Sequence, residues 1–337
     1  MASLRIAVDA MGGDFGLRSS IPASLAALSE NPSLHLSLVG DQDAIAATLS
    51  GKRYDSSRLA IVHSQSIVTM DEKPSVAVRK KRDSSMALSL ELLRDHKASA
   101  VVSAGNTGAL VAMGCIMIER LSGIHRPAIC APIPSRAGHT YMLDLGANIE
   151  CDAQELYQFA VMGSALVSIL DNKPSPRIAV LNIGEELQKG KDYLREAAEL
   201  IQNDQSLNYV GFVEGGDVLG DAADVIVCEG FVGNVAIKVC EGTAKFIGEG
   251  LVAQFKQTTY GRLVGMAAKP LLRSFRQQIN PERYNGAALL GLKGVVVKSH
   301  GRSGVSSFQN AIRHAVQACE LNLPKQIEAQ LQAVAKK

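Results

Sequence analysis

The 337-residue sequence contains no tryptophan, and aromatic residues make up only 4% of it. Its hydrophobic core must therefore be built from aliphatic side chains. An excess of charge of one sign is also missing: the formal net charge is +2, which argues against a nucleic-acid-binding protein. The longest nearly apolar stretch, TGALVAMGCIMI, is too short to span a bilayer, which takes about 20 residues. Because no secretory-type apolar segment lies near the start, we expect a cytoplasmic protein.

Several well-known signatures of functional sites are absent as well. None of the six cysteines forms a C-x-x-C pair, which predicts free thiols in a reducing compartment rather than a disulfide framework or a zinc site. The sequence has no G-x-S-x-G elbow, no G-x-x-x-x-G-K-[ST] phosphate loop, no G-x-G-x-x-G nucleotide fingerprint and no H-E-x-x-H motif. Among the seven histidines, His300 is the best placed for chemistry because it follows a predicted strand.

One pattern recurs along the chain: a short β-branched run, a glycine-containing turn and a longer helical period. It predicts α/β layers, with a largely parallel central sheet and flanking helices. Runs such as AVV and VIV are continuously apolar, as expected when both faces of a sheet are covered. We expect one catalytic α/β unit over residues 1–337, with two intertwined subdomains as the alternative. DNKPSPR, near residue 174, is either a linker or a surface loop.

The turns that follow the predicted strands are rich in small and polar residues. They are DAMGGD, SAGNTG, LDLGAN, LNIGEE, CEGFVGN and SHGRSG. In α/β sheets ligands collect at the carboxyl ends of strands, where helix N-termini present free N–H groups. Six such turns at equivalent strand ends therefore indicate a cleft for an anion or polar substrate. The alternative is that parallel α/β folds need tight turns in any case, with Thr107 serving only as a helix N-cap.

An acidic group offers an alternative function. Asp217 and Asp221 are four residues apart, with Asp224 nearby, which is compatible with a cation site. The glycines among them argue against a regular helix, so capping or a polar turn is the favoured interpretation. We predict no metal and no cofactor. A metal- and nicotinamide-dependent dehydrogenase remains the alternative that this acidic group supports.

The chain closely resembles the bacterial phosphate acyltransferase (PlsX) family along nearly its whole length. The ordered motifs that carry the resemblance are VDAMGGDFG, MDEKPSVAVRKKRDSSM, SAGNTGAL, LDLGANIEC, LNIGEELQKG, CEGFVGNVAIK and YNGAALLGLKGVVVKSHG. Leu17 and Glu229 depart from residues common in the family, without removing a side chain that we consider essential. The resemblance implies a homodimer with a fold similar to isocitrate and isopropylmalate dehydrogenases and to phosphotransacetylase.

The same resemblance implies a reaction and its partners. Acyl-[acyl carrier protein] and orthophosphate would give acyl phosphate and free carrier protein, at the start of phospholipid synthesis. The next user of acyl phosphate would be a membrane acyltransferase. A non-catalytic role as a membrane scaffold for lipid enzymes is a further alternative, and it is compatible with catalysis.

This chemistry explains why the usual motifs are missing. Orthophosphate is itself the nucleophile, and a thiol with a pKa of about 8.5 leaves with little help from an acid. The protein has only to position the phosphate and stabilise an oxyanion, for which backbone N–H groups, amides and a few cations suffice. We predict that the SAGNTG turn cradles phosphate or acyl phosphate. Its proposed binding residues are Ser103, Gly105, Asn106, Thr107 and Gly108.

Further residues are assigned to the reaction. Asn106, Asn148, Asn182 and Asn234 can donate amide hydrogen bonds without repelling an anion, although Asn is also common in turns. Lys189 can neutralise phosphate, or it can be an ordinary exposed lysine. With His300, these residues form the predicted catalytic set.

Other charged residues have supporting assignments. Arg79, Lys81 and Arg82 can contact phosphate or an acidic carrier protein, the alternative being a solvated basic face. Asp14 and Asp144 are expected to orient neighbouring cations or amides.

Residues 251–280 combine five basic residues with many apolar ones and contain no Asp or Glu. We expect a protruding amphipathic helical segment, which Pro270 breaks into two helices. This composition is typical of a segment that lies on a membrane surface. The alternative is a helical pair that buries its apolar face against a dimer partner. The predicted membrane contacts are Phe255, Leu263, Val264, Leu271, Leu272 and Phe275. The protein would then associate peripherally with the inner face of the cell membrane.

Overall fold

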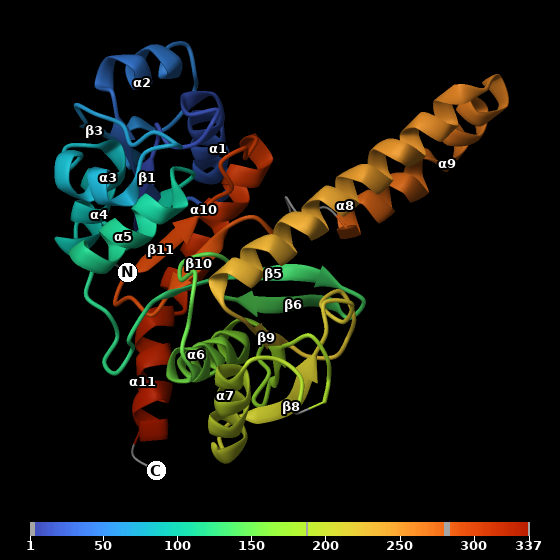
Figure 1. Ribbon diagram of the computed structural model, residues 1–337. Helices are drawn as coiled ribbons and strands as arrows, with labels where there is room; N and C mark the ends of the chain where they lie inside the picture. Colours follow the sequence, from blue (N-terminus) through green and yellow to red (C-terminus); the bar gives the residue numbers. More distant parts are fainter. Residues whose placement is uncertain (1–3, 187, 280–283, 336–337) are drawn as a thin grey trace.

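The computed structural model describes residues 4–186, 188–279 and 284–335, with only the backbone described at 274–279 and 333–335. The chain forms a mixed α/β fold in which helices flank a large central sheet (Figure 1), as the sequence predicts. The strands are β1 (Leu4–Asp9), β2 (Leu34–Gly40), β3 (Leu59–His63), β4 (Ala100–Ser103), β5 (Ala128–Ser135), β6 (Gly138–Leu143), β7 (Arg177–Leu181), β8 (Asn208–Val213), β9 (Val225–Val227), β10 (Ala287–Leu290) and β11 (Val295–Lys298).

The helices follow the strands and cover both faces of the sheet (Figure 1). They are α1 (Leu17–Glu30), α2 (Gln42–Leu49), α3 (Pro74–Lys80), α4 (Ser85–Arg94), α5 (Thr107–Met117), α6 (Ala153–Leu170), α7 (Asp192–Asn203), α8 (Gly230–Gln257), α9 (Thr259–Ile279), α10 (Val305–Glu320) and α11 (Leu323–Ala335). Local sequence sets their starts: the Asp152 and Glu155 side chains form a capping box at α6, and Asp41 and Ser84 cap α2 and α4.

Among the described residues the sheet has 11 strands, in the order β3-β2-β1-β4-β11-β10-β5-β6-β9-β7-β8. The two flanks are parallel, as predicted, but β10, β5 and β6 pair in antiparallel fashion at the centre. As a result, β6, β9, β7 and β8 run opposite to β1, β2, β4 and β11. The sheet therefore consists of two parallel halves of opposite direction, joined by a short antiparallel region.

Alternating residues of the strands supply two separate layers of core. Ile6 and Val8 of β1 face a layer that includes residues of α1, α6 and α10. Ala7, between them, faces a second layer with residues of α4 and α5. Because both faces of the sheet are buried, its inner strands are apolar throughout.

Helices α8 and α9 form an arm that projects from the body (Figure 1). The chain breaks at Thr258, whose backbone is extended and whose hydroxyl accepts a 2.9 Å hydrogen bond from the N–H of Gly261. The expected break at Pro270 is wrong, since Pro270 lies inside α9. Thr258 ends the arm's first helix because its side chain caps the second.

Candidate functional site

The six glycine-rich turns fall into two groups. The first group follows β1, β4 and β11, and the second follows β6, β7 and β9. Because the two halves of the sheet run in opposite directions, the groups leave opposite ends of the hydrogen-bonded ladder. The six turns lie at the carboxyl ends of their strands, as expected, but on strands of two opposite directions. The antiparallel strands β5, β6 and β10, which reverse the chain direction, are the cause. Helix α8, which begins in the second group, nevertheless reaches the first group through the contact of Glu241 with His300.

The first group is organised around a row of three side chains. Asp9, Ser103 and Lys298 are the last residues of β1, β4 and β11, and they are paired in register across the sheet. Residues in register on adjacent strands project from the same face. The Ser103 hydroxyl donates a 2.6 Å hydrogen bond to Asp9 Oδ2 and accepts a 3.0 Å bond from the N–H of Gly105.

Two opposite charges of this row are deeply buried. Asp9 is 1% exposed and Lys298 is 9% exposed. Burial raises the pKa of the Asp9 carboxyl, and the hydrogen bond from Ser103 opposes that rise. Burial also lowers the pKa of Lys298 to about 8, an effect that the charge of Asp9 opposes. Neither residue was a predicted site residue. The signal was present in the sequence as one charge at the end of each apolar run, IAVD and VVVK.

The turns of the first group touch one another. A Cβ added to Gly12 would lie 2.6 Å from Asp9 Oδ2 and 2.7 Å from the N of Gly105, so only glycine fits there. The N–H of Asp14 donates a 2.8 Å hydrogen bond to the carbonyl of Gly301. The Asp14 carboxylate pairs with Arg302 at 3.2 Å, the kind of contact that its predicted role of orienting a cation requires; the role itself remains a prediction.

Asn106 is tied into the protein at both ends of its amide. Its Oδ1 accepts a 3.0 Å hydrogen bond from the N–H of Ala109, which makes it the N-cap of α5. Its Nδ2 donates to the carbonyls of Thr69, Met70 and Glu72 at 2.9–3.4 Å. In this arrangement the amide holds the preceding loop to the turn. Its role as a direct donor to phosphate remains a prediction.

The remaining predicted cradle residues open α5. Thr107 and Gly108 lie in its first turn, where backbone N–H groups have no intrahelical acceptor. A Cβ on Gly108 would lie 2.8 Å from Cγ of Pro74, the first residue of α3, so Gly108 permits close packing of α3 on α5. The helix start that the sequence predicts as an anion site is therefore formed, and Asn106, not Thr107, is its N-cap.

His300 lies at the rim of the first group. Its N–H donates a 2.8 Å hydrogen bond to Oδ1 of Asn285, whose Nδ2 donates to the Ser299 hydroxyl at 2.8 Å. The His300 ring lies 3.6 Å from the carboxylate of Glu241, on α8. The histidine therefore links the turn after β11 to the arm. Asn285 is a third residue of the group that sequence reasoning missed.

The basic residues of α3 and the following loop lie near this group. Arg79 and Arg82 are exposed and Lys81 is half-buried. Within the described part of the chain, none of the three forms an ion pair with a carboxylate. Ser85, three residues after Arg82, acts on Asp9 as a hydrogen-bonding neighbour. Arg79, Lys81 and Arg82 thus lie near the first group without a carboxylate partner among the described residues.

The second group is centred on Asp144, which is fully buried. Its carboxylate accepts hydrogen bonds from the N–H groups of Ile129, Ala147 and Asn148 and from the Asn148 amide, at 2.7–3.1 Å. The Asn148 amide also donates to the carbonyl of Pro127 at 2.8 Å. The expected role of Asp144 in orienting an amide is confirmed. The Asn148 amide is committed to the protein, and its catalytic role remains a prediction.

The other predicted residues of the second group differ in what they contact. Asn182 donates to the carbonyl of Lys189 at 3.1 Å, while its buried Oδ1 has no partner among the described residues. The Lys189 ammonium pairs with Glu186 at 2.9 Å. Asn234, in the first turns of α8, packs against Gly146 and makes no side-chain hydrogen bond within the described chain. Asn234 is therefore free to meet a ligand, whereas Lys189 is paired with a carboxylate.

The acidic residues proposed as an alternative metal-cation site form ion pairs with basic side chains of the protein. Arg177 binds Asp221 at 2.6 Å and Asp224 at 3.1 Å, and Lys173 binds Asp224 at 3.0 Å. Asp217 accepts a 2.9 Å hydrogen bond from the N–H three residues before it, which is the favoured turn role. The dehydrogenase alternative loses the residues on which it relied.

The arm carries apolar side chains at its surface. Leu263 is 59% and Leu271 77% exposed. Of the other predicted membrane contacts, Val264 is exposed and Phe255 and Leu272 are half-buried, while the Phe275 side chain and residue 280 lie outside what the structure describes. Within the described residues, no helix is both long and apolar enough to cross a membrane.

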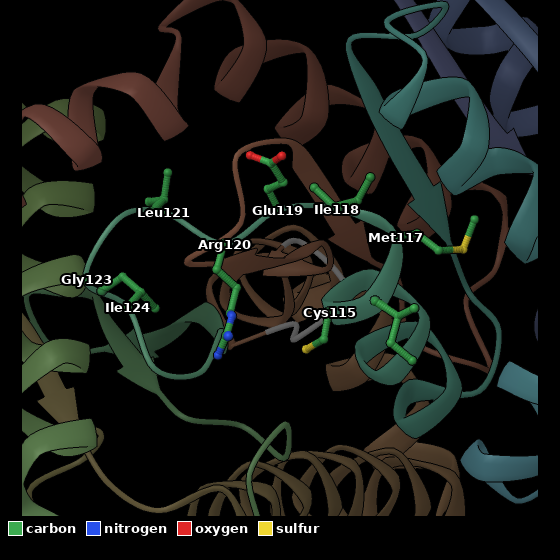
Figure 2. A pocket seen from close by; sticks show the side chains of 9 residues that line it. Cys115, Met117, Ile118, Glu119, Arg120, Leu121, Gly123 and Ile124 are labelled. Carbon is green, nitrogen blue, oxygen red and sulfur yellow. The ribbon is translucent and has the colours of Figure 1, made fainter.

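A surface pocket of about 530 Å³ lies elsewhere, between the end of α5 and the loop leading to β5. In Figure 2, Cys115 lies on the helix side and Arg120 on the loop side. The pocket contains none of the predicted site residues. We therefore place the candidate site at the turns, where charged and amide groups gather.

The sequence was compared with known proteins. Residues 4–326 match the model of a family described as fatty acid synthesis protein. A phosphate acyltransferase from Pseudomonas putida is 50% identical over 333 residues, which cover 98% of this chain and 99% of the relative. A phosphate acyltransferase from Hydrogenovibrio crunogenus is 46% identical over 332 residues, covering 98% of each chain.

Solved structures share the fold at low sequence identity. A phosphotransacetylase from Streptococcus pyogenes has a TM-score of 0.61 and 20% identity, covering 94% of each chain. A branched-chain phosphotransacylase from Enterococcus faecalis has a TM-score of 0.56 and 14% identity, covering 94% of this chain and 99% of that one. These structures establish a phosphotransacetylase-like fold. The predicted likeness to isocitrate and isopropylmalate dehydrogenases remains a prediction.

Proposed function

The chain belongs to the phosphate acyltransferase family, and from this premise we propose that it transfers a fatty acyl group from acyl-[acyl carrier protein] to orthophosphate. As a member of this family the chain is an acyltransferase, and its reaction moves an acyl group to or from phosphate. The acyl phosphate product would serve phospholipid synthesis, where a membrane acyltransferase consumes it on the way to phosphatidic acid.

The reaction needs positioning and charge stabilisation rather than a protein nucleophile. A phosphate oxygen attacks the thioester carbonyl, a tetrahedral oxyanion forms, and the carrier's thiolate leaves when the carbonyl reforms. Free N–H groups at the start of α5 and in the glycine turns of the first group supply donors for an anion. Asn234 and Lys189 of the second group are candidates for the oxyanion, with Lys189 exchanging Glu186 for substrate.

A single observation carries the assignment of phosphate to the first group. Lys298, whose side chain is buried, lies in register beside Ser103, the residue directly before the turn that opens α5. A cation next to a helix N-terminus favours an anion. The contacts of Asn106 fix this turn against the loop before α3, so the donors are held before phosphate arrives.

The exposed basic residues on and after α3 support an acidic partner. Arg79 and Arg82 are solvent-exposed beside the first group, and Pro74 of the same helix packs on the start of α5. An acidic carrier protein docked there would bring its thioester to the turn that we assign to phosphate. Electrostatic complementarity of this kind raises association rates and depends on salt.

We further propose that the arm binds the inner face of the membrane. Exposed leucines and the absence of acidic residues from 251 to 280 support this location, since such segments bind anionic lipid surfaces. Docking would shorten the transfer of a reactive acyl phosphate to its membrane-bound user. Burial of the arm against a second copy of the chain, in a homodimer, is the competing proposal.

The reaction is tested with purified protein, acyl-[acyl carrier protein] and labelled orthophosphate. Labelled product that hydroxylamine destroys is expected. Arg79→Glu with Arg82→Glu should raise KM for the carrier substrate at low salt while leaving KM for phosphate unchanged. No labelled product under conditions where the Pseudomonas putida relative is active would refute the proposed reaction.

The arm is tested by flotation with anionic vesicles at low and high salt. Leu263→Glu together with Leu271→Glu should abolish flotation without reducing soluble acyl transfer. Leu200→Glu, at an exposed position of α7 in the body, serves as the matched control. A double variant that still floats excludes the arm as the anchor, and one that becomes monomeric favours the dimer interface.

A further inference from the structure

The row formed by Asp9, Ser103 and Lys298 has no assigned part in the reaction beyond placing a charge near the turn. Its three residues end adjacent parallel strands at one level and extend a buried row, Ala7, Val101 and Val296, on the same face of the sheet. Two buried opposite charges on either side of Ser103 need a reason, because the desolvation of two charges can exceed their attraction.

The hydrogen bonds of the row are incomplete. Asp9 Oδ1 is buried and has no hydrogen-bond partner of normal geometry among the described residues, although Ser85 and the backbone of Met11 and Gly12 lie near enough to lower the pKa of the carboxyl. The Lys298 ammonium carries three donors, and within the described chain only the carbonyl of Ser299 accepts from it. A charge pair kept only for stability would have these groups satisfied. The incomplete bonding indicates a functional role.

The row leads directly to the turn at the start of α5. Asp9 holds the Ser103 hydroxyl, which in turn accepts from the N–H of Gly105, while the carbonyl of Ser103 accepts from the N–H of Ser299 at 2.8 Å. Gly12 packs against both the Asp9 carboxylate and Gly105. The state of one carboxylate therefore affects the turns after β1, β4 and β11 together.

We propose that Asp9, Ser103 and Lys298 form a positioning device for the phosphate site. Lys298 keeps Asp9 ionised, the Asp9 carboxylate orients the Ser103 hydroxyl, and that hydroxyl fixes the N–H of Gly105 and the turn that follows. Loss of either charge makes the other one costly, so the remaining residue changes its protonation state and the turn loses its fixed acceptor. This inference rests on the proposed function only in assigning phosphate to this turn.

The surroundings of the pair leave few other groups to titrate. The helices packed on this face, α4 and α5, contribute uncharged residues beside it, including Ser85 and Met86. Ala287 is the neighbour of Lys298 on β10. The nearest titratable side chains in the turns face elsewhere: His300 lies beside Glu241, and Asp14 beside Arg302.

The test measures anion affinity by calorimetry on the full chain, with orthophosphate and with sulfate, whose charge stays constant over the pH range used. Lys298→Met and Asp9→Asn should each weaken affinity about tenfold or more, and the double variant should recover most of that loss, because contacting residues couple. Lys293→Met is the matched control, since Lys293 lies on the same chain segment and pairs with exposed Glu119. It should behave as the wild type.

A pH series supplies a readout that a merely structural role would not change. Sulfate affinity of the wild type should fall as pH rises through about 8, where Lys298 loses its proton. Ser103→Ala, which breaks the link but keeps both charges, should weaken binding about as much as Lys298→Met. If Asp9→Asn does not fold, the pH series of the wild type and the sulfate affinity of Ser103→Ala still test the proposed positioning role.

Two results would overturn the inference: unchanged affinity in Lys298→Met, or a double variant whose loss equals the product of the single losses. They are separate from failure of the proposed function. A protein that shows the expected affinities but makes no acyl phosphate supports the device and refutes the reaction. A protein that makes acyl phosphate with unchanged affinity in Lys298→Met supports the reaction and refutes the device.

Discussion

The two groups of turns use the same residue types for different purposes. Asp144, in the second group, has both carboxylate oxygens occupied by N–H groups of its own loop. Asp9, in the first group, keeps one oxygen without a partner among the described residues, and the buried Lys298 lies on the other side of Ser103. An aspartate that ends a strand before a glycine turn is therefore either a structural anchor or a polarised part of a site. The number of its satisfied oxygens distinguishes the two.

Removal of the structural anchor should have the largest effect. Asp144→Ala leaves the N–H groups of Ile129, Ala147 and Asn148 without their acceptor in a buried loop, and we expect a loss of about 3–5 kcal/mol in the free energy of unfolding. Urea denaturation measures it. Asp14→Ala, which removes a partly exposed carboxylate of the first group, should stay within about 0.5 kcal/mol. Equal losses in the free energy of unfolding of the two variants would show that the two aspartates do not differ in structural importance.

The two asparagines sharpen the comparison. Asn106→Ala should lower turnover about 10²-fold with an unchanged circular dichroism spectrum, because the turn shifts when its cap and loop contacts are lost. Asn148→Ala should mainly lower the urea midpoint, since its amide donates to the Pro127 carbonyl and to the Asp144 carboxylate. A stable but inactive Asn148→Ala variant would indicate that the reacting atoms lie at the second group of turns.

Acid titration separates carboxylates of opposite character. Although burial raises it, hydrogen bonds from Arg177 and Lys173 hold the pKa of Asp224 at about 2. The stability that Asp224 contributes is therefore present above its unfolded pKa of 3.8 and is lost as pH falls from about 4 to about 2. Asp9, whose pKa is raised, has the opposite sign.

The expected size of the Asp224 effect is about 1–2 kcal/mol, because its partners are partly exposed. Asp224→Asn should lack that part of the acid-dependent loss in urea titrations between pH 4 and pH 2. A variant with the same pH dependence as the wild type would show that the ion pairs contribute nothing in solution.

Metal removal should have the smallest effect. Across the residues that the structure describes, no cluster of three His, Cys, Asp or Glu side chains is arranged to hold an ion. Exhaustive chelation should leave acyl phosphate formation within about twofold of the untreated rate, consistent with stabilisation by N–H groups and lysines. Activity that disappears and returns with Mg²⁺ or Mn²⁺ would require a ligand set in one of the two groups.

The sequence predicted the repeated strand, turn and helix units because each is local. It did not predict the reversal at the centre of the sheet, for which β5 is instructive. Pro132 and Pro134 argue against an inner strand, yet among the described residues β10 pairs with Ala128–Cys130 and with neither proline. How far a neighbouring strand extends depends on long-range contacts, so it cannot be inferred from the local pattern of apolar residues in the sequence.

The same limit applies to the site. SAGNTG was recognised from its glycines and its place before a helix, and the structure does form a helix start there. Asp9 and Lys298 were missed because a charge at the end of an apolar run usually marks a solvated rim. Their pairing joins residues 289 positions apart in the chain, and only the strand order places both beside Ser103.

Helix α8 has a consequence for local unfolding. Of its 28 residues only Gly230 and Gly233, at its root, are buried. Ala236 and Ile237 pack against the core and Glu241 contacts His300, but beyond these residues the helix is held by backbone hydrogen bonds and by α9. Little apolar packing therefore opposes its transient opening there. Amide hydrogen exchange should therefore quicken from the root of α8 toward Thr258. The arm is then the part of the protein in which a bound surface or partner adds most to protection.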